Sequence, residues 1–301
     1  MKIVFSTNIV GYMCAAILCR ANPKAVLVPY NYWYDYEMCF GSVTNNEKLI
    51  FAGITPKLLD LMRLMKVTTN IFIIDDHTTS MRELAGEGIY RPEMKTADEI
   101  GVSAAVWKMA YPNTDLPLSV RYVADYADWI RNDENKLLNF GLKSFNTMPT
   151  NNIWDLILTD DERFLQKIMN KGRANLAYLV PWYKRLVRSY AIPGYFNYDQ
   201  DETLSAIFLN QANVDDSVFD SLEEEFDVYI RGVLGKSFNW LVNISTRRDN
   251  LDVSLLAEDF GGGGYDWSAG LMTDDIFKVI VPSPLLKGKP MSITSKDYHD
   301  N

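Results

Sequence analysis

The first part of the chain alternates between short apolar strands and helices, and this order limits the possible folds more than any other feature. Such alternation is typical of a parallel sheet, because consecutive parallel strands need a crossover connection that is usually a helix. The sequence therefore predicts an α/β fold that begins with a parallel sheet. The expected strands are Lys2–Phe5, Ala25–Pro29, Lys48–Ala52 and Asn70–Ile74. Helices are expected at Gly11–Arg20 and after Thr55-Pro56, with Thr55 as N-cap.

A helical region and a second mixed region follow. Helices are expected at Val102–Ala110, Leu118–Arg131, Glu134–Phe145, Asp160–Lys171 and Arg173–Val187. Ile192-Pro193-Gly194 interrupts this run and is the predicted hinge between domains 1–192 and 193–301, since a chain of 301 residues is long enough for two hydrophobic cores. The second domain is expected to contain strands at Thr203–Phe208, Trp240–Ser245 and Ile276–Val281. Its expected helices are Asp215–Phe226 and Val253–Asp259.

Composition excludes several classes of function. The net charge of −9 disfavours binding to duplex nucleic acid. The sequence contains no apolar run near the roughly 18 residues of a membrane span, and it starts without the pattern of a signal peptide. An odd set of cysteines without a CxxC pair favours reduced thiols and a cytoplasmic location. With two histidines, His77 and His299, a site built from several histidine ligands is excluded.

Two short motifs carry the chemical information. Asp75-Asp76-His77 directly follows the expected strand Asn70–Ile74, and ligands bind at the carboxyl ends of strands in open α/β sheets. Gly261–Gly264 is a run of glycines followed by Tyr265 and, further on, by an Ala-Gly pair. Such a run allows positive φ angles and close approach of the backbone to a neighbour or a ligand.

These motifs occur in an order that resembles the DHH/DHHA1 phosphoesterases. Phe5–Leu18 resembles the first motif, H-x-x-D-x-D-G, and Asn70–Ser80 resembles the DHH strand. Ser103–Trp129 resembles the helical region, in which Ala124–Trp129 carries the late metal-binding aspartate, and Phe260–Gly270 resembles GGGH-x-x-AG. The resemblance implies an N-terminal parallel-sheet DHH-like domain with a helical extension, followed by a smaller α/β DHHA1-like domain.

The resemblance also implies a two-metal phosphodiesterase site, and the sequence departs from it at most ligand positions. Asn8 and Val10 stand where the first motif has aspartates, and Ala52-Gly53 stands where the second has one. Asp76 replaces the ligating histidine, whereas Asp125 matches the late aspartate. Two carboxylates cannot neutralise two divalent ions, so we expect no resident cofactor beyond one weakly bound Mg²⁺ or Mn²⁺ at Asp76 and Asp125.

Each candidate residue also has a structural interpretation. Asp75 and Asp76 could cap the following turn, His77 could be a hydrogen-bonded structural histidine, and Asp125 with Asp128 could belong to a solvated helix face. In the family the glycine motif binds phosphate, but Tyr265 replaces its histidine and cannot carry positive charge near neutral pH. Arg247, together with Arg248, is a possible source of charge for an anion. The candidate ligand-binding residues are Arg247, Gly261, Gly262, Gly263, Gly264 and Tyr265.

The leading functional hypothesis is a catalytically degenerate phosphoesterase homologue, or pseudoenzyme, that acts as a binding or interaction protein. A protein partner is expected, with phosphate or a nucleotide as the alternative ligand and no membrane. The aromatic cluster that could face such a partner is Tyr30, Tyr32, Trp33, Tyr34, Tyr36 and Phe40.

The second hypothesis is a weakly active metal-dependent phosphodiesterase on short oligonucleotides or cyclic dinucleotides, using Asp75, Asp76, His77 and Asp125. A partner chain could also supply missing groups. The simultaneous loss of the motifs suggests a phage or viral source, with the host cytoplasm as location.

Overall fold

The computed structural model describes residues 1–32, 34–89, 94–96, 100–197, 203–211 and 214–283. The chain divides into two compact units, Met1–Ala177 (unit 1) and Tyr178–Asn301 (unit 2). The division falls inside helix α9 (Glu162–Tyr190), before the expected boundary at residue 192. No helix in the described ranges combines the length and the apolar character needed to cross a membrane.

Unit 1 contains a parallel sheet with the strand order β2-β1-β3-β4-β5. The predicted parallel sheet is confirmed. Strand β2 lies on one side of β1, and β3 to β5 follow on its other side. The chain connections therefore change direction between β1 and β3, and in such sheets ligands bind at this switch point. The strands are β1 (Lys2–Ser6), β2 (Val26–Tyr30), β3 (Leu49–Ala52), β4 (Ile71–Asp75) and β5 (Met94–Thr96).

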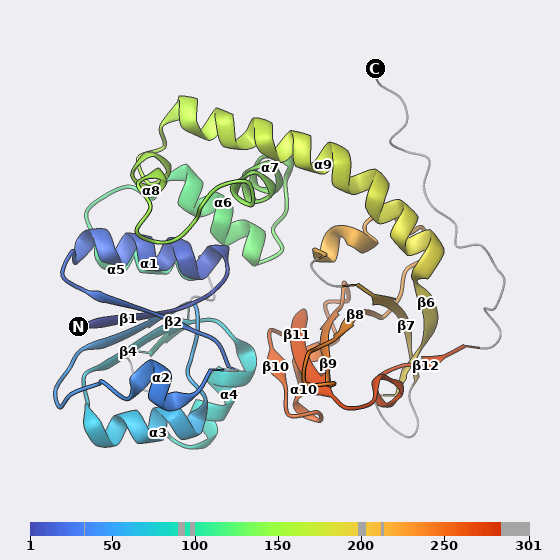
Figure 1. Ribbon diagram of the computed structural model, residues 1–301, viewed down its shortest axis with the longest axis horizontal. Coiled ribbons are helices and arrows are strands. Elements are labelled where there is room, and N and C mark those ends of the chain that lie inside the picture. Colours follow the sequence, from blue (N-terminus) through green and yellow to red (C-terminus); the bar gives the residue numbers. More distant parts are fainter. Residues whose placement is uncertain (33, 90–93, 97–99, 198–202, 212–213, 284–301) are drawn as a thin grey trace. The chain divides into compact units, whose positions relative to one another are not determined.

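Apolar side chains of this sheet are buried on both faces. Along β1, Ile3 and Phe5 pack into one core while Val4 packs into the other, as the period of two along a strand requires. Figure 1 shows α1 and α5 on one face and α3 on the other. The helices of unit 1 before α9 are α1 (Ile9–Ala21), α2 (Tyr36–Phe40), α3 (Leu58–Val67), α4 (Thr78–Gly86), α5 (Val102–Ala110), α6 (Leu118–Ala127), α7 (Asp133–Leu142) and α8 (Ile153–Ile157).

Helix α9 corrects one prediction. The sequence predicted separate helices before and after Gly172, but the helix is continuous from Glu162 to Tyr190. A Cβ atom on Gly172 would lie 1.9 Å from the carbonyl oxygen of Leu137 on α7. The reciprocal position is Gly141 on α7, where a Cβ would lie 2.1 Å from the carbonyl oxygen of Ile168 on α9. These glycines let two helix backbones touch, so Gly172 is a packing residue and not a helix break.

Unit 2 contains a mixed sheet with the order β10-β11-β9-β8-β7-β6-β12, in which β7 and β8 run parallel. Helix α10 (Val253–Glu258) packs with β9 and β11 around one apolar core of this unit. The strands are β6 (Ile192–Asn197), β7 (Thr203–Asn210), β8 (Val228–Leu234), β9 (Trp240–Ser245), β10 (Gly263–Gly264), β11 (Ser268–Thr273) and β12 (Val281–Pro282).

Three expected elements of unit 2 differ in the structure. Ile192-Pro193-Gly194, the predicted hinge, begins strand β6, and the carbonyl of Pro193 accepts a hydrogen bond from Ser283. The helix expected at 215–226 is a single 3-10 turn, Asp216–Phe219, which the Asp215 side chain caps at its start. The strand expected at 276–281 is instead a 3-10 turn, Ile276–Lys278, followed by β12. Buried apolar side chains hold these irregular segments in place, and such contacts leave no periodic pattern in the sequence.

Candidate functional site

The best-defined polar cluster lies at the carboxyl end of β4. Asp75 is fully buried, and its carboxylate accepts a hydrogen bond of 2.7 Å from Thr55 Oγ1. Its other oxygen lies 2.7 Å from Nδ1 of His77. Ligand atoms of Asp75, Asp76 and His77 all lie within 4.8 Å of one another, and no other group of this kind occurs in the part of the chain that the structure describes. Asp75 thus ends β4, at the strand end where the sequence placed it.

Thr55 has a different role from the predicted one. Helix α3 begins at Leu58, and its N-cap is Lys57, so Thr55 does not cap it. Thr55 is 1% exposed and donates its hydroxyl hydrogen bond to Asp75 instead. Sequence reasoning missed this contact because Thr55-Pro56 matches a helix start and the partner is 20 residues away.

The electrostatic environment of His77 is set by its acidic neighbours. Burial lowers the pKa of His77, but the carboxylates of Asp75 and Asp76 and the hydrogen bond to Asp75 outweigh burial and raise it above its ordinary value. Burial, together with Asp76 and Asp75, raises the pKa of Cys14 on α1, so that thiol stays protonated. Asp75 thus positions the imidazole and favours its protonated form.

Residues that stand at the first and second motif positions lie close together at the switch point between β1 and β3. Asn8 caps α1, because its side-chain oxygen accepts hydrogen bonds from Gly11 N at 2.8 Å and Ser6 Oγ at 3.0 Å. Gly53 has φ +68°, and a Cβ there would lie 3.6 Å from Ser6 Oγ and 3.8 Å from Val10 Cγ1. The structure therefore brings Ser6, Val10 and Gly53 together, and all three are neutral. A pair of divalent ions does not fit a set of groups of this kind.

Asp125 lies on α6 and does not join the Asp75 cluster among the described residues. Its neighbour on the sequence motif, Asp128, packs against the start of α5, since a Cβ on Gly101 would lie 2.7 Å from Asp128 Oδ2. Burial, and then the Asp125 carboxylate, raise the pKa of Asp128 to about 6. The pairing of Asp76 with Asp125 around one ion stays a prediction.

The glycine motif is used for strand packing. The backbone N–H groups of Gly261, Gly262 and Tyr265 donate to carbonyl oxygens of Glu258, Ala257 and Ser268, each at 2.8 Å. A Cβ on Gly262 would lie 2.2 Å from the carbonyl oxygen of Gly270, so glycine is required for β10 to lie against β11. The Tyr265 ring stacks on Trp267, with ring centroids 5.0 Å apart. Because these three N–H groups already have protein acceptors, they could bind a phosphate only if the loop rearranged.

Both arginines before this motif are paired with aspartates. Arg247 donates to Asp220 Oδ1 at 3.0 Å and lies over the Tyr229 ring. Arg248 donates to Asp227 Oδ1 at 2.7 Å. An anionic ligand would therefore have to compete with carboxylates for these guanidinium groups.

Asp227 provides a testable pH dependence. Burial raises the pKa of Asp227, but hydrogen bonds from Ser205 and Arg248 outweigh it and hold the pKa below its usual value. We expect Asp227→Asn to lower the free energy of unfolding by about 1–2 kcal/mol near neutral pH, since it removes a charged acceptor. Because the pKa of Asp227 is lower in the folded state than in the unfolded state, its carboxylate contributes its whole stabilisation above the unfolded pKa of about 3.9. That contribution is lost as the pH falls through the folded pKa. Urea unfolding of both proteins at about pH 7 and pH 3 should show the difference narrowing in acid; an unchanged difference would contradict this account.

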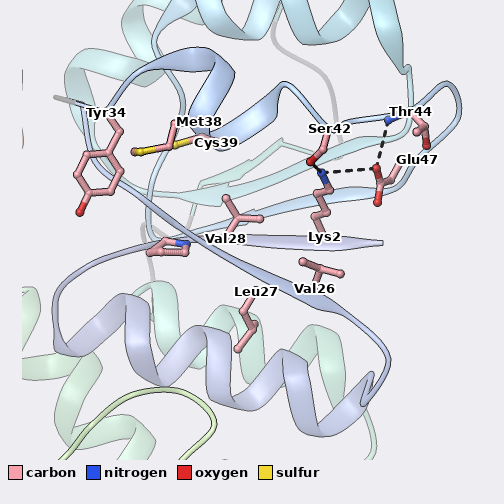
Figure 2. A pocket seen from close by; sticks show the side chains of 11 residues that line it. Lys2, Val26, Leu27, Val28, Tyr34, Met38, Cys39, Ser42, Thr44 and Glu47 are labelled. Carbon is pink, nitrogen blue, oxygen red and sulfur yellow. Dashed lines mark hydrogen bonds and ion pairs between the residues drawn. The ribbon is translucent and has the colours of Figure 1, made fainter.

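The predicted aromatic cluster is divided between core and surface. Tyr30 and Phe40 are buried in the core beneath α2 and α3, whereas Trp33, like His299, lies outside the described residues. Tyr34 is 36% exposed and lines a pocket of about 580 Å³ beside the edge strand β2 (Figure 2). The pocket is lined by β2 from Val26 to Pro29, and it includes none of the residues of the Asp75 cluster.

Comparison with known proteins gives a structural match without a sequence match. No protein-family model and no curated protein matches the sequence. The pGpG-specific phosphodiesterase PggH from Vibrio cholerae has a TM-score of 0.50 at 14% identity, covering 90% of this chain and 92% of that chain. RecJ from Thermus thermophilus, in complex with Mn²⁺, has a TM-score of 0.46 at 12% identity, covering 91% of this chain and 49% of that chain. At these identities the likeness concerns the fold alone, and the PggH match confirms the DHH phosphoesterase fold expected from the motifs.

Proposed function

We propose that this chain, which has the DHH phosphoesterase fold, is a degenerate member that binds a partner or ligand without hydrolysing phosphodiesters. The observation that carries the proposal is the neutral set Ser6, Val10 and Gly53 at the switch between β1 and β3. Two-metal hydrolysis needs a dense set of anionic ligands, because the two cations repel each other at about 4 Å. The Asp75 cluster alone does not supply that charge.

The binding role is assigned first to a protein partner. Two exposed apolar side chains, Tyr34 and Met38, line the pocket beside β2, and Met38 is 68% exposed. Tyrosine and methionine are enriched at protein interfaces. A nucleotide or phosphate is the alternative ligand, and it is less favoured because Arg247 and Arg248 are already paired with aspartates.

The second candidate function is weak metal-dependent phosphodiesterase activity. The observation that favours it is the Asp75–His77 contact, in which a buried carboxylate orients an imidazole near the further carboxylate of Asp76. Such an altered site would hold one ion and would act on short oligonucleotides or cyclic dinucleotides.

A manganese titration distinguishes the two candidates. Protein freed of metal with EDTA is titrated with Mn²⁺ by calorimetry, and parallel samples are incubated with di-adenylate, pGpG and cyclic di-AMP. We expect no two-site binding and no turnover. Two-site binding with metal-dependent cleavage that is lost in Asp125→Ala would contradict the proposal, and cleavage with a single bound ion would favour the second candidate.

A further inference from the structure

Strand β2 forms one edge of the parallel sheet in unit 1. Within the described residues it pairs with β1 alone. In a parallel strand, successive residues point their N–H and C=O groups alternately to the two sides. The N–H of Val26 donates to the carbonyl oxygen of Met1 at 3.1 Å, so the outward-facing positions are Leu27 and Pro29. The outer edge therefore presents one backbone donor, Leu27 N–H, and two acceptors, the carbonyl oxygens of Leu27 and Pro29.

The pocket of about 580 Å³ follows this edge (Figure 2). Residues Val26 to Pro29 of β2 form one wall, and the exposed side chains of Tyr34 and Met38 line it as well. Val26 on the edge strand is itself 54% exposed. Proteins usually cover, charge or twist an apolar strand edge, because its unpaired backbone groups can pair with another strand. An uncovered edge beside a pocket therefore indicates a place where a further strand can bind.

The polar end of the pocket favours a neutral group. The Lys2 side chain is 8% exposed, and its Nζ donates to Ser42 Oγ at 2.7 Å and lies 3.9 Å from Glu47 Oε2. An ammonium has three N–H donors, and 3.9 Å is too long for a hydrogen bond, so Lys2 can still donate to a ligand. The nearby Glu47 carboxylate would repel a phosphate or a carboxylate at that point. A peptide carbonyl accepts from Lys2 without this repulsion.

We propose that β2 binds an extended segment of a protein partner, which adds to the sheet as a further strand. The inference rests on the proposed function, since it names how the partner is recognised. The backbone of the segment would bond to the outward groups of Leu27 and Pro29, and alternate side chains would contact Tyr34 and Met38. In strand addition of this kind, main-chain hydrogen bonds give affinity, and pockets for alternate side chains give specificity.

A second copy of this chain is a poorer occupant of the edge. Pro29 has no N–H group, and the N–H of Ala25 already donates to the carbonyl oxygen of Asn22 at 2.9 Å. If two β2 edges paired with each other, Leu27 would be left as the donor on each side, and the Pro29 carbonyls would gain little. A segment without proline can donate to both outward carbonyl oxygens. The edge therefore favours a segment of a different protein.

The test begins with peptides selected for binding. A phage-displayed library of random peptides of about seven residues, enough for one strand, is panned against the full chain. The most enriched peptide is synthesised with a fluorescein label, and its Kd is measured by fluorescence anisotropy. We expect apolar residues at alternate positions of the selected peptides. Between about 50 and about 300 mM salt the Kd should change by less than about twofold, because backbone hydrogen bonds are screened little.

A series of N-methylated peptides then tests whether the backbone is recognised. The selected peptide is remade with one N-methyl group at each position in turn. Because the edge offers the carbonyl oxygens of Leu27 and Pro29, methylation should weaken binding at least about fivefold at two positions separated by one residue. At the residue between them the N–H group points away from β2, so we expect a change of less than about twofold there.

Met38→Ser and Leu59→Ser form a matched pair of variants. Met38 is 68% exposed and lines the pocket, whereas Leu59 is 70% exposed, lies on α3 and does not line it. We expect Met38→Ser to weaken peptide binding at least about fivefold, because it removes an apolar wall of the pocket. Leu59→Ser should stay within about twofold of wild type. Circular dichroism shows whether both variants are folded.

Several results would overturn the inference. Failure to enrich any peptide, or equal losses in the two serine variants, would exclude the pocket as a peptide site. Sensitivity to methylation without the two-residue spacing would mean that side chains alone are recognised. A Kd that rises steeply with salt would indicate an anionic ligand instead. Since none of these measurements involves manganese or hydrolysis, their failure is distinct from a failure of the proposed loss of catalysis.

Discussion

Replacing Gly172 with alanine is expected to lower the free energy of unfolding of unit 1 by about 3 kcal/mol. The added Cβ would lie 1.9 Å from the carbonyl oxygen of Leu137, which is backbone in the middle of α7 and cannot rotate away. Helices α7 and α9 would have to move apart, and the contact at Gly141 would open with them. The measurement is urea unfolding followed by circular dichroism.

Gly86→Ala is the matched control for this prediction. Gly86 also lies in a helix, at the end of α4, but a Cβ there meets nothing within 4 Å. Alanine has the higher helix propensity, so we expect Gly86→Ala to be neutral or to stabilise by up to about 1 kcal/mol. If both variants unfolded at the same urea concentration, the close contact between α7 and α9 would not exist in solution.

The same glycine shows where local sequence patterns stop being informative. Strands β1, β3 and β4 were predictable, because burial on both faces gives short, nearly continuous apolar runs such as Lys2–Phe5 and Asn70–Ile74. Gly172 lies between the two helices expected from the sequence, Asp160–Lys171 and Arg173–Val187. Glycine is needed at position 172 because the carbonyl oxygen of Leu137, a residue 35 positions earlier, leaves no room for a Cβ atom. No local sequence pattern records such a contact.

In the candidate site, too, contacts between sequence neighbours were predictable and contacts between distant segments were not. Contact between Asp75 and His77 was predictable because the residues are neighbours in sequence at a strand end. The hydrogen bond from Thr55 to Asp75, and the pairing of Arg247 with Asp220, join segments that are brought together by the strand order of each sheet. A sequence shows which groups are present, whereas the fold decides which of them are already satisfied.

Restoring the lost carboxylates should create a manganese site. The variant V10D/G53D/D76H replaces the neutral or altered positions with the groups that the family resemblance implies. A Cβ at position 53 lies 3.8 Å from Val10 Cγ1, so carboxylates at both positions would face one ion near the buried Asp75. We expect Mn²⁺ binding at least about tenfold tighter than in wild type, since each additional 1.4 kcal/mol of binding free energy is worth a factor of ten. Calorimetry measures the affinity, and Mn²⁺ should raise the melting temperature of the variant more than that of wild type.

The decisive control is V10N/G53N/D76H, which has nearly the same side-chain shapes without the two new charges. Aspartate and asparagine both tolerate the left-handed backbone at Gly53, where φ is +68°, so any strain from leaving glycine is common to the two variants. Without Mn²⁺ the aspartate variant should be the less stable one, because its new carboxylates repel each other and Asp75. With Mn²⁺ that order should reverse. Equal manganese affinity in both variants would mean that positions 10 and 53 do not face a common ion, and that the loss of charge there does not explain a loss of catalysis.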